Sequence, residues 1–188
     1  MVEVYISDNE EEKMKEIYQF RYNVYVEELQ YLKNDINVHV HGMEFDDYDK
    51  YSRHIVLKKD SQIQAYVRII EDVGQGLLVL NKINRKELFS GFKKVEISRL
   101  IVSENARFSK IILQLVGAIY QQLVEMDCTY ILADTFKDSN SYKMLEMLGF
   151  QELGVEYHDT SYNVGTESIV LYAKKEDICK CWKNTYER

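Results

Sequence analysis

One strongly apolar segment, VEISRLIV over residues 95–102, carries the ionisable residues Glu96 and Arg99 with Ser98 between them. A run that is apolar on both faces is typical of a central strand. Burial disfavours the charged form of a carboxylate, so we expect the pKa of Glu96 to be raised toward the range of a general base. The alternative is a buried Glu–Arg network that only holds the sheet together.

Strict alternation along this strand predicts which side chains share a face. It groups Glu96 and Ser98 with Leu100. It sets Arg99 on the other face, with three apolar residues: Val95, Ile97 and Ile101. Glu96 and Arg99 are therefore both expected in the middle of the fold.

Two further arginines stand where the pattern predicts burial. Arg21 lies on the apolar stripe of a helix expected from about residue 14, and Arg68 lies on a strand that is otherwise apolar. Burying an unpaired guanidinium costs several kcal/mol, so Arg21 must meet a carboxylate or line a wet cleft. Asp46 and Asp49, in the motif EFDDYD, offer acceptors nearby in sequence. The alternative is a purely structural Arg–Asp clamp.

The loop SENARFSK, residues 103–110, opens a long amphipathic helix. Backbone N–H groups at a helix N-terminus form an anion site, and Arg107, Ser109 and Lys110 add donors. Such a loop suits a phosphate or a pyrophosphate.

The elements that position these residues follow from hydrophobic periodicity. The opening VEVYI and the segments RHIVLKK, QIQAYVRIIE, KVEISRLIV, TYILADTF and TESIVLYAKK are predicted to be strands. Helices are predicted from about residue 14, over 109–126, over 139–148 and over the C-terminal residues.

Strands and helices alternate through the second half of the chain, which predicts an α/β or α+β fold with helices over a mixed sheet. The length of 188 residues fits one domain. We expect residues 1–173 to form it and residues 174–188 to add a C-terminal helical segment of the same domain.

Composition excludes several classes of function. The apolar share of 46% is that of a packed globular protein. The formal net charge of −7 argues against a broad nucleic-acid-binding face, because phosphate neutralisation dominates such affinity.

No segment approaches the roughly 20 apolar residues of a membrane span. The N-terminal residues do not resemble a secretory signal, and the odd count of three cysteines suggests reduced thiols. We therefore expect a cytoplasmic protein. The histidines and the pair Cys179 and Cys181 lack metal-binding spacing, so no metal is expected.

Four pieces in order resemble the acyl-homoserine-lactone synthases: R-x-x-V-Y from Arg21, EFDDYD from Glu44, a strand-ending Arg68 and E-x-S-R from Glu96. The second half, with MLEMLGF after the 129–136 strand, resembles the wider GCN5-related N-acetyltransferase (GNAT) superfamily. The resemblance covers roughly residues 10–155 and is also shared with the long-chain N-acyl amino acid synthases.

The resemblance implies a mixed sheet splayed at its central strand, with an acyl-thioester arm in the V-shaped gap. It implies Glu96 as general base, acting directly or through water, within the catalytic group Glu96, Ser98 and Arg99. It implies that an amine substrate lies near a set of charged and aromatic residues: Arg21, Tyr25, Tyr31, Asp46, Asp49 and Arg68. A backbone N–H near Ile101 or Val102 would stabilise the oxyanion. The loop from Asn105 through Arg107 and Ser109 to Lys110 would hold the donor phosphate.

The chain departs from the lactone synthases at Tyr25 and Tyr31, where that family usually has Phe and Trp in its S-adenosylmethionine pocket. NARFSK also replaces the glycine-rich loop of the coenzyme A acetyltransferases. Leu145 replaces their leaving-group tyrosine, for which Tyr142 is a substitute one helical turn away.

The leading hypothesis is an N-acyltransferase that takes an acyl group from acyl-CoA or from the phosphopantetheine of acyl carrier protein to a small amino-acid-like amine. The alternatives are a lactone synthase using S-adenosylmethionine and a non-catalytic domain that binds a ligand or a protein. Acyl carrier protein is acidic, so its docking requires a basic patch near the thioester entrance. The candidates are Lys93, Lys94, Arg107, Lys110, Lys137 and Lys143.

Overall fold

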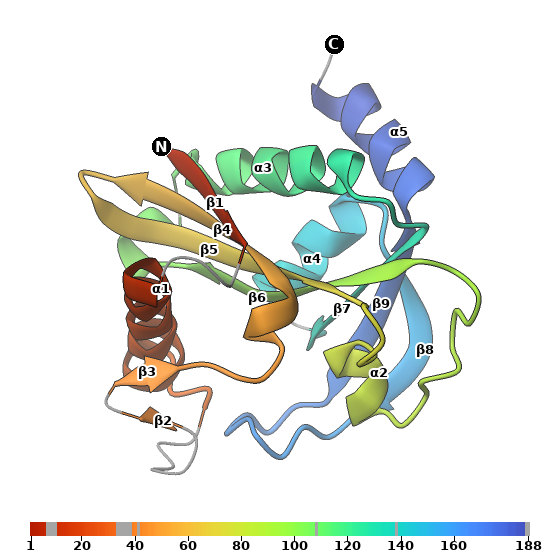
Figure 1. Cartoon of the computed structure of the whole chain (residues 1–188), viewed down its shortest axis with the longest axis horizontal. Coiled ribbons are helices and arrows are strands. Elements are labelled where there is room, and N and C mark those ends of the chain that lie inside the picture. The colour runs from red at the N-terminus through yellow and green to blue at the C-terminus, as the bar shows by residue number, and fades with distance from the viewer. Residues whose placement is uncertain (7–10, 33–38, 41, 108, 138, 187–188) are drawn as a thin grey trace.

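The computed structural model describes residues 1–6, 11–32, 39–40, 42–107, 109–137 and 139–186 (Figure 1). Within these residues the main sheet has seven strands in the order β1-β4-β5-β6-β7-β9-β8. Their bounds are β1 Val2–Ile6, β4 Ser52–Lys59, β5 Gln62–Glu71, β6 Lys94–Val102, β7 Tyr130–Phe136, β8 Gln151–Tyr157 and β9 Ser168–Lys174. β6 and β7 pair in parallel and the other neighbours pair antiparallel, so the predicted mixed sheet is confirmed.

Helices cover both faces of the sheet. They are α1 Glu11–Tyr22, α2 Leu78–Lys82, α3 Ile111–Glu125, α4 Asn140–Met147 and α5 Lys175–Tyr186. A π-helical turn, η1 (Asn23–Glu28), continues α1, and short 3-10 turns form η2 (Asp49–Tyr51) and η3 (Glu104–Ala106). A separate hairpin joins β2 (His39–Val40) and β3 (Met43–Glu44) beside α1.

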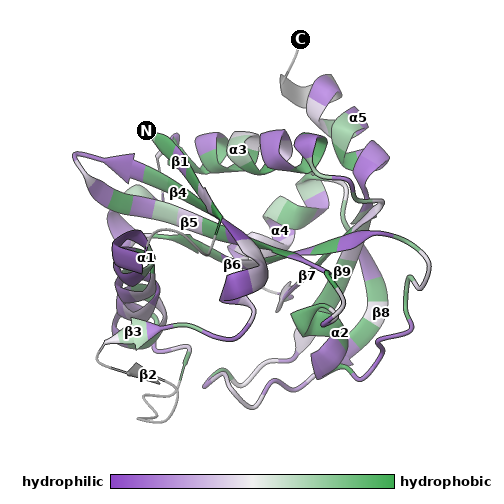
Figure 2. Ribbon diagram, viewed as in Figure 1, coloured by the Kyte–Doolittle hydropathy of each residue, from purple (hydrophilic) through white to green (hydrophobic). Residues whose placement is uncertain are grey.

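The core divides by face. On one face, α3, α4 and α5 pack on the sheet in one cluster that contains Ile97, Leu115 and Ile131. On the other face the core is split: α1 and η1 pack around Tyr66, and α2 packs around Leu132. In Figure 2 the short helix α2 is largely hydrophobic, while α1 is largely hydrophilic and buries only a narrow stripe.

The six predicted strands and four predicted helices are confirmed within one or two residues at most ends. The turn between β4 and β5 lies at Asp60 and Ser61, both with positive φ, and Gly74 and Gly76 form the turn after β5. α2 and β8 were not predicted. α2 spans only five residues, and the pattern of β8 is half exposed, so neither gives a strong periodic signal. α5 begins at Lys175, close to the expected start of the C-terminal segment.

Candidate active site

β6 and β7 part halfway along their length. Their pairing runs from Lys94 opposite Tyr130 to Ile97 opposite Ala133, and β6 continues for five more residues to Val102. Beyond Ile97, none of the described strands pairs with the edge of β6 that faces β7. The expected splay of the sheet at its central strand is therefore confirmed.

A β-bulge in β6 accompanies this divergence. Arg68 of β5 lies opposite Ser98, whereas Tyr66, two residues earlier, lies opposite Ile101, so β6 contains one extra residue. Arg99 lies in this bulge with φ of +54°. A bulge bends its strand and turns the following side chains over, which directs the end of β6 away from β7.

The bulge overturns the predicted facing of side chains. Ser98 and Arg99 both face the α1 side, and Arg99 does not share a face with Val95 and Ile97. Leu100 packs against the α3 core and is not on the side of Ser98. Strict alternation fails because the extra residue shifts the period by one.

The space between the parted strands is a cavity of about 620 Å³. Its apolar residues come from η1, α3, α4 and the ends of β6 and β7, and the same elements also contribute polar side chains such as Arg99, Asp134 and Ser141. A cavity of this volume, lined by apolar and polar side chains together, fits an acyl-thioester arm. The lining includes the site residues predicted from the sequence as follows: Tyr25, Tyr31, Ser98, Arg99, Ile101, Val102 and Arg107.

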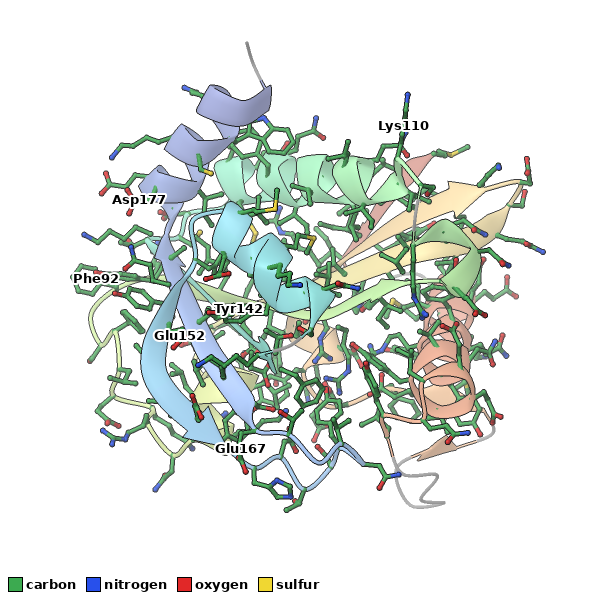
Figure 3. The ribbon with its side chains drawn as sticks, turned by 180° about the vertical axis from the view of Figure 1, so that it is seen from behind. Phe92, Lys110, Tyr142, Glu152, Glu167 and Asp177 are labelled. Carbon is green, nitrogen blue, oxygen red and sulfur yellow. The ribbon has the colours of Figure 1, made fainter. Side chains whose placement is uncertain are left out.

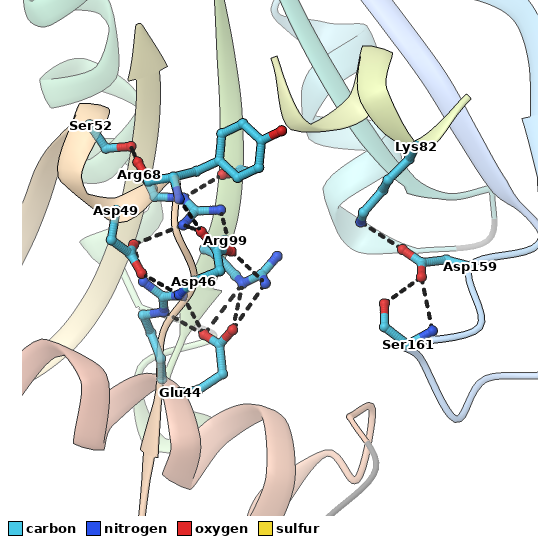
Figure 4. A network of polar contacts seen from close by, with 12 residues as sticks. Glu44, Asp46, Asp49, Ser52, Arg68, Lys82, Arg99, Asp159 and Ser161 are labelled. Carbon is cyan, nitrogen blue, oxygen red and sulfur yellow. Dashed lines mark hydrogen bonds and ion pairs between the residues drawn. The ribbon is translucent and has the colours of Figure 1, made fainter. Parts of the chain in front are cut away.

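A network of three arginines and three carboxylates links α1, β3 and the segment before β4 to strands β5 and β6 (Figure 4). Its members are Arg21, Arg68, Arg99, Glu44, Asp46 and Asp49. Glu44 begins the motif that supplies the two aspartates, but it was not among the site residues predicted from the sequence. Formal charges within the network balance, so it brings no net charge to the cavity.

Arg21 is central to this network and is fully buried. It reaches Glu44 and Asp49, each at 2.5 Å, and so pairs with one of the two predicted aspartates. The arginines hold the pKa of Glu44, Asp46 and Asp49 below their ordinary values despite burial. All six groups are thus charged at neutral pH.

Arg68 and Arg99 complete the network from adjacent strands. Arg68 donates to Ser98 Oγ at 2.9 Å and to Asp46 at 2.7 Å, and it is fully buried. Arg99 reaches Glu44 at 3.0 Å and Asp46 at 3.2 Å. Of the three arginines, Arg99 alone lines the cavity; Arg21 and Arg68 position the others from behind.

Glu96 lies apart from the arginines. It is fully buried, and its Oε2 accepts the N–H of Val79 at the start of α2 at 2.9 Å. Burial and the nearby charge of Asp134 raise its pKa to about 8, which agrees with the direction expected. Glu96 does not line the cavity, so an amine there cannot touch it directly.

Asp134 is a second carboxylate beside the cavity, and the sequence analysis missed it. It lines the cavity from β7, and Tyr157 of β8 donates to its Oδ2 at 2.5 Å. Lys82 of α2 lies 3.8 Å from the same oxygen. The signal was present: Asp134 is charged within the apolar strand TYILADTF, the criterion that singled out Glu96.

Aromatic rings enclose one side of the cavity. Tyr31 and Tyr162 each pack edge-on against Phe136, with ring centroids 5.9 and 5.5 Å apart. The guanidinium of Arg99 lies 5.7 Å from the ring of Tyr25. Tyr31 O accepts the N–H of Asn163, which ties the loop after β8 to the chain after η1.

The predicted phosphate loop meets the cavity at Arg107, which lines it. Arg107 already pairs with Glu28 and donates to Val102 O. Asn105, Ser109 and Lys110 are exposed and lie outside the lining, and Lys110 extends outward at the start of α3 (Figure 3).

The other predicted groups lie away from the cavity. The hydroxyl of Tyr142 on α4 donates to Glu152 of β8 at 2.7 Å, and the two side chains point toward each other in Figure 3. Tyr142 is not part of the cavity lining, unlike Leu145. Lys93 and Lys94 lie at the paired end of β6 and contact Asp127 and Asp72, so the six basic residues do not form one patch at the entrance.

Within the described ranges, no group of three His, Cys, Asp or Glu side chains has a geometry that could hold a metal ion. In the same part of the chain no helix is long and apolar enough to cross a membrane.

Comparisons with known proteins bear on the fold. Residues 20–117, just over half of the chain, match the family model described as an acetyltransferase (GNAT) domain. No curated protein sequence matches the chain.

Solved structures resemble the whole chain. One is a CoA-dependent acyl-homoserine lactone synthase, BjaI, with SAM and isopentyl-CoA, at a TM-score of 0.71, 14% identity and coverage of 98% of this chain and 88% of that chain. Another is FeeM, an N-acyl amino acid synthase from uncultured soil microbes, with a TM-score of 0.63, 16% identity, and coverage of 95% of this chain and 98% of that chain. A third is an acyl-CoA N-acyltransferase from Pseudomonas aeruginosa, with a TM-score of 0.62, 18% identity, and coverage of 92% of this chain and 98% of that chain. At these identities the likeness establishes a shared fold.

Proposed function

The chain belongs to the acetyltransferase (GNAT) family, and from this premise we propose that it transfers an acyl group from an acyl thioester to the amine of a small, amino-acid-like acceptor. The observation that carries the proposal is the cavity at the divergence of β6 and β7. There an apolar channel meets a set of charged groups at a break in the sheet.

The donor would lie in the gap with its acyl chain along the apolar wall. Ile97, Leu115 and Leu145 belong to that wall, and the unpaired edge of β6 lies beside it. Backbone N–H groups near Ile101 or Val102 would then stabilise the oxyanion that forms at the thioester carbonyl. Acyl-CoA is the donor we favour, because BjaI and the Pseudomonas enzyme are described as using CoA thioesters.

The acceptor would enter from the side of Tyr25, Tyr31 and Arg99. Arg21, Asp46, Asp49 and Arg68 would shape this side indirectly, because they fix Arg99 and Ser98. In the proposed reaction Glu96 is the general base. Since it is fully buried, the proton must reach it through another group or a water molecule.

The proposed acyl transfer forms one bond and breaks one. The acceptor ammonium loses one proton to the base, and its nitrogen attacks the thioester carbonyl carbon. The C–N bond forms, the C–S bond breaks, and the electron pair of that bond leaves with sulfur. The thiolate takes up a proton, so the net products are an amide, a free thiol and one proton released.

Lactone synthesis is the second candidate function, favoured by the likeness to BjaI, whose structure contains SAM. Tyr25 and Tyr31 make this side of the cavity more polar than the Phe and Trp typical of the lactone synthases. For that reason we place an amino-acid-like acceptor ahead of S-adenosylmethionine.

The test is to incubate the purified protein with acyl-CoA of several chain lengths and with acyl carrier protein thioesters. Each is combined with a panel of amino acids or with S-adenosylmethionine. Thiol release and product masses are recorded. Amide products support the proposal, a lactone product supports the second candidate, and no product with any pair refutes both.

A matched pair of variants tests the base. Glu96→Gln should lose roughly 10²- to 10⁴-fold in rate while the fold is kept. Glu87→Gln, on the exposed turn before β6, changes the same functional group outside the cavity lining and should leave the rate unchanged. An unchanged rate in Glu96→Gln rules out its role as base.

A further inference from the structure

Asp134 lies at the point where β6 and β7 begin to part. The last pair between β6 and β7 joins Ile97 and Ala133, so Asp134 is the first residue of β7 beyond the part that pairs with β6. Its side chain lines the cavity and is 14% exposed. An amine in the cavity can therefore touch Asp134, whereas Glu96 is fully buried.

The carboxylate of Asp134 is held on one side only. Tyr157 donates to Oδ2 at 2.5 Å, and Lys82 lies 3.8 Å from the same atom. Lys82 is shared with Asp159, which it contacts at 2.6 Å (Figure 4). In the described part of the chain Oδ1 accepts no hydrogen bond, so one oxygen is left for a ligand.

Glu96 and Asp134 face the same side of the sheet. Glu96 lies opposite Leu132 in the parallel pair, and Asp134 is two residues further along β7, about 6.6 Å at the usual rise of a parallel strand. Glu96 Oε1 is buried and has no hydrogen-bond partner among the described residues. The charge of Asp134 is, after burial, the largest contribution to the raised pKa of Glu96.

Two carboxylates close together in a low-dielectric site tend to hold one proton between them. The other titratable or charged groups around the pair are Arg68 on β5, Lys82 on α2, Tyr157 on β8, and Asp159 and Tyr162 in the loop that follows. The single lysine contact and the tyrosine hydrogen bond to the pair both go to Asp134, whereas Glu96 accepts the backbone N–H of Val79. Burial favours the neutral acid at Glu96, while the hydrogen bond from Tyr157 and the contact with Lys82 orient the carboxylate of Asp134 in the cavity.

We propose that Asp134 is a further catalytic residue, the cavity-facing carboxylate that binds the acceptor ammonium and takes its proton, with Glu96 as its buried partner. This inference rests on the proposed function and refines its base, which becomes the pair with Asp134 as the point of entry. The ammonium gives one proton to Asp134, the amine forms the C–N bond, and the C–S bond breaks. Of the two protons that the nitrogen loses, one ends on the thiol and one leaves to solvent.

The first experiment needs no activity. Side-chain carboxyl ¹³C labels on Glu and Asp are followed by NMR as a function of pH in the full-length protein. We expect a glutamate signal that titrates near pH 8 and is missing in Glu96→Gln. Asp134→Asn should move that midpoint to lower pH, whereas the exposed control Asp127→Asn, at the other end of β6, should not. An unmoved midpoint in Asp134→Asn overturns the pairing.

The second experiment measures acyl transfer to the acceptor found for the wild type. Asp134→Asn should lower kcat/KM by roughly 10²- to 10⁴-fold. Tyr157→Phe keeps the carboxylate and removes only its donor, so it should lower kcat/KM by less than Asp134→Asn. A wild-type rate in Asp134→Asn overturns the catalytic role.

The two failures are distinguishable. If the wild type transfers no acyl group to any acceptor, the proposed function fails and the proton-accepting role of Asp134 fails with it. The pairing of Glu96 with Asp134 then still stands or falls with the NMR titration.

Discussion

Glu96→Gln should change how the stability of this protein depends on pH. Glu96 is fully buried, and its pKa is raised from 4.5 to about 8, chiefly by burial and then by Asp134. Between these two values the unfolded chain releases the proton and the folded chain keeps it. Stability is therefore fully present below pH 4.5 and is lost as pH rises toward 8. Glutamine stays neutral, so the variant lacks this loss.

The expected size follows from the gap between about 8 and 4.5, which is about 3.5 pH units. Each unit corresponds to about 1.4 kcal/mol, so the wild type should lose on the order of 5 kcal/mol relative to Glu96→Gln. Domains of this kind are stable by roughly 5–15 kcal/mol in total, so the effect is large enough to measure. A pH-independent difference in the free energy of unfolding is also expected, because Gln places an NH₂ group at the position of Oε1, which has no hydrogen-bond partner among the described residues.

Urea unfolding at steps from pH 4 to 9.5 gives the free energy of unfolding of both proteins, and the difference curve isolates Glu96. The curve is needed because Asp46 and Asp49, whose pKa values are lowered, contribute stability that is lost in the opposite direction, as pH falls. Glu87→Gln serves as the surface control, and its own curve is subtracted. A difference curve that is flat, or that favours the wild type more as pH rises, refutes a raised pKa at Glu96.

Three further perturbations test the network, the cavity and the C-terminal helix. Arg21→Met leaves Glu44 and Asp49 without their buried partner and should cost about 3–5 kcal/mol in urea unfolding; a loss under about 1 kcal/mol would contradict a tightly held network. Ser141→Trp places a bulky ring on the cavity lining, so it should lower kcat/KM for long-chain acyl-CoA. The loss should be several-fold larger than in the control Met147→Trp, because Met147 is exposed on the same helix. Equal effects would argue against the cavity as the acyl channel. Trp182→Ala removes a ring stacked on Tyr120 at 4.8 Å and should cost about 2–3 kcal/mol, below the roughly 3–5 of a fully buried aromatic residue; a smaller cost would show that α5 is not an integral part of the domain.

Much of the sheet could be predicted because its central strands are long and apolar. β6 was predicted at Lys94–Val102, the range that the structure shows. The same criterion, a charge within an apolar run, found Arg21, Arg68 and Glu96, all of which are fully buried. Burial of a charge is costly, so its appearance in such a run is informative without any structure.

The partners of these charges were harder to predict, because they come from segments distant in sequence. Glu44 meets Arg21 across 23 residues and Arg99 across 55. Periodicity describes one segment at a time and cannot show which segments meet. Asp134 was missed for a different reason, since its strand was predicted correctly and its charge was simply not weighed.

The bulge in β6 connects the fold to the proposed chemistry. Without the extra residue, alternation would turn Arg99 toward Val95 and Ile97 in the apolar core under α3, away from Glu44 and Asp46. A non-glycine residue at φ of +54° costs on the order of 1–3 kcal/mol. The contacts of Arg99 with Glu44 and Asp46 offset this cost, and Arg21 and Arg68 hold those carboxylates in place. Two arginines that never touch the cavity therefore maintain the bend that opens it, so variants of either should impair acyl transfer through geometry, even where the protein remains folded.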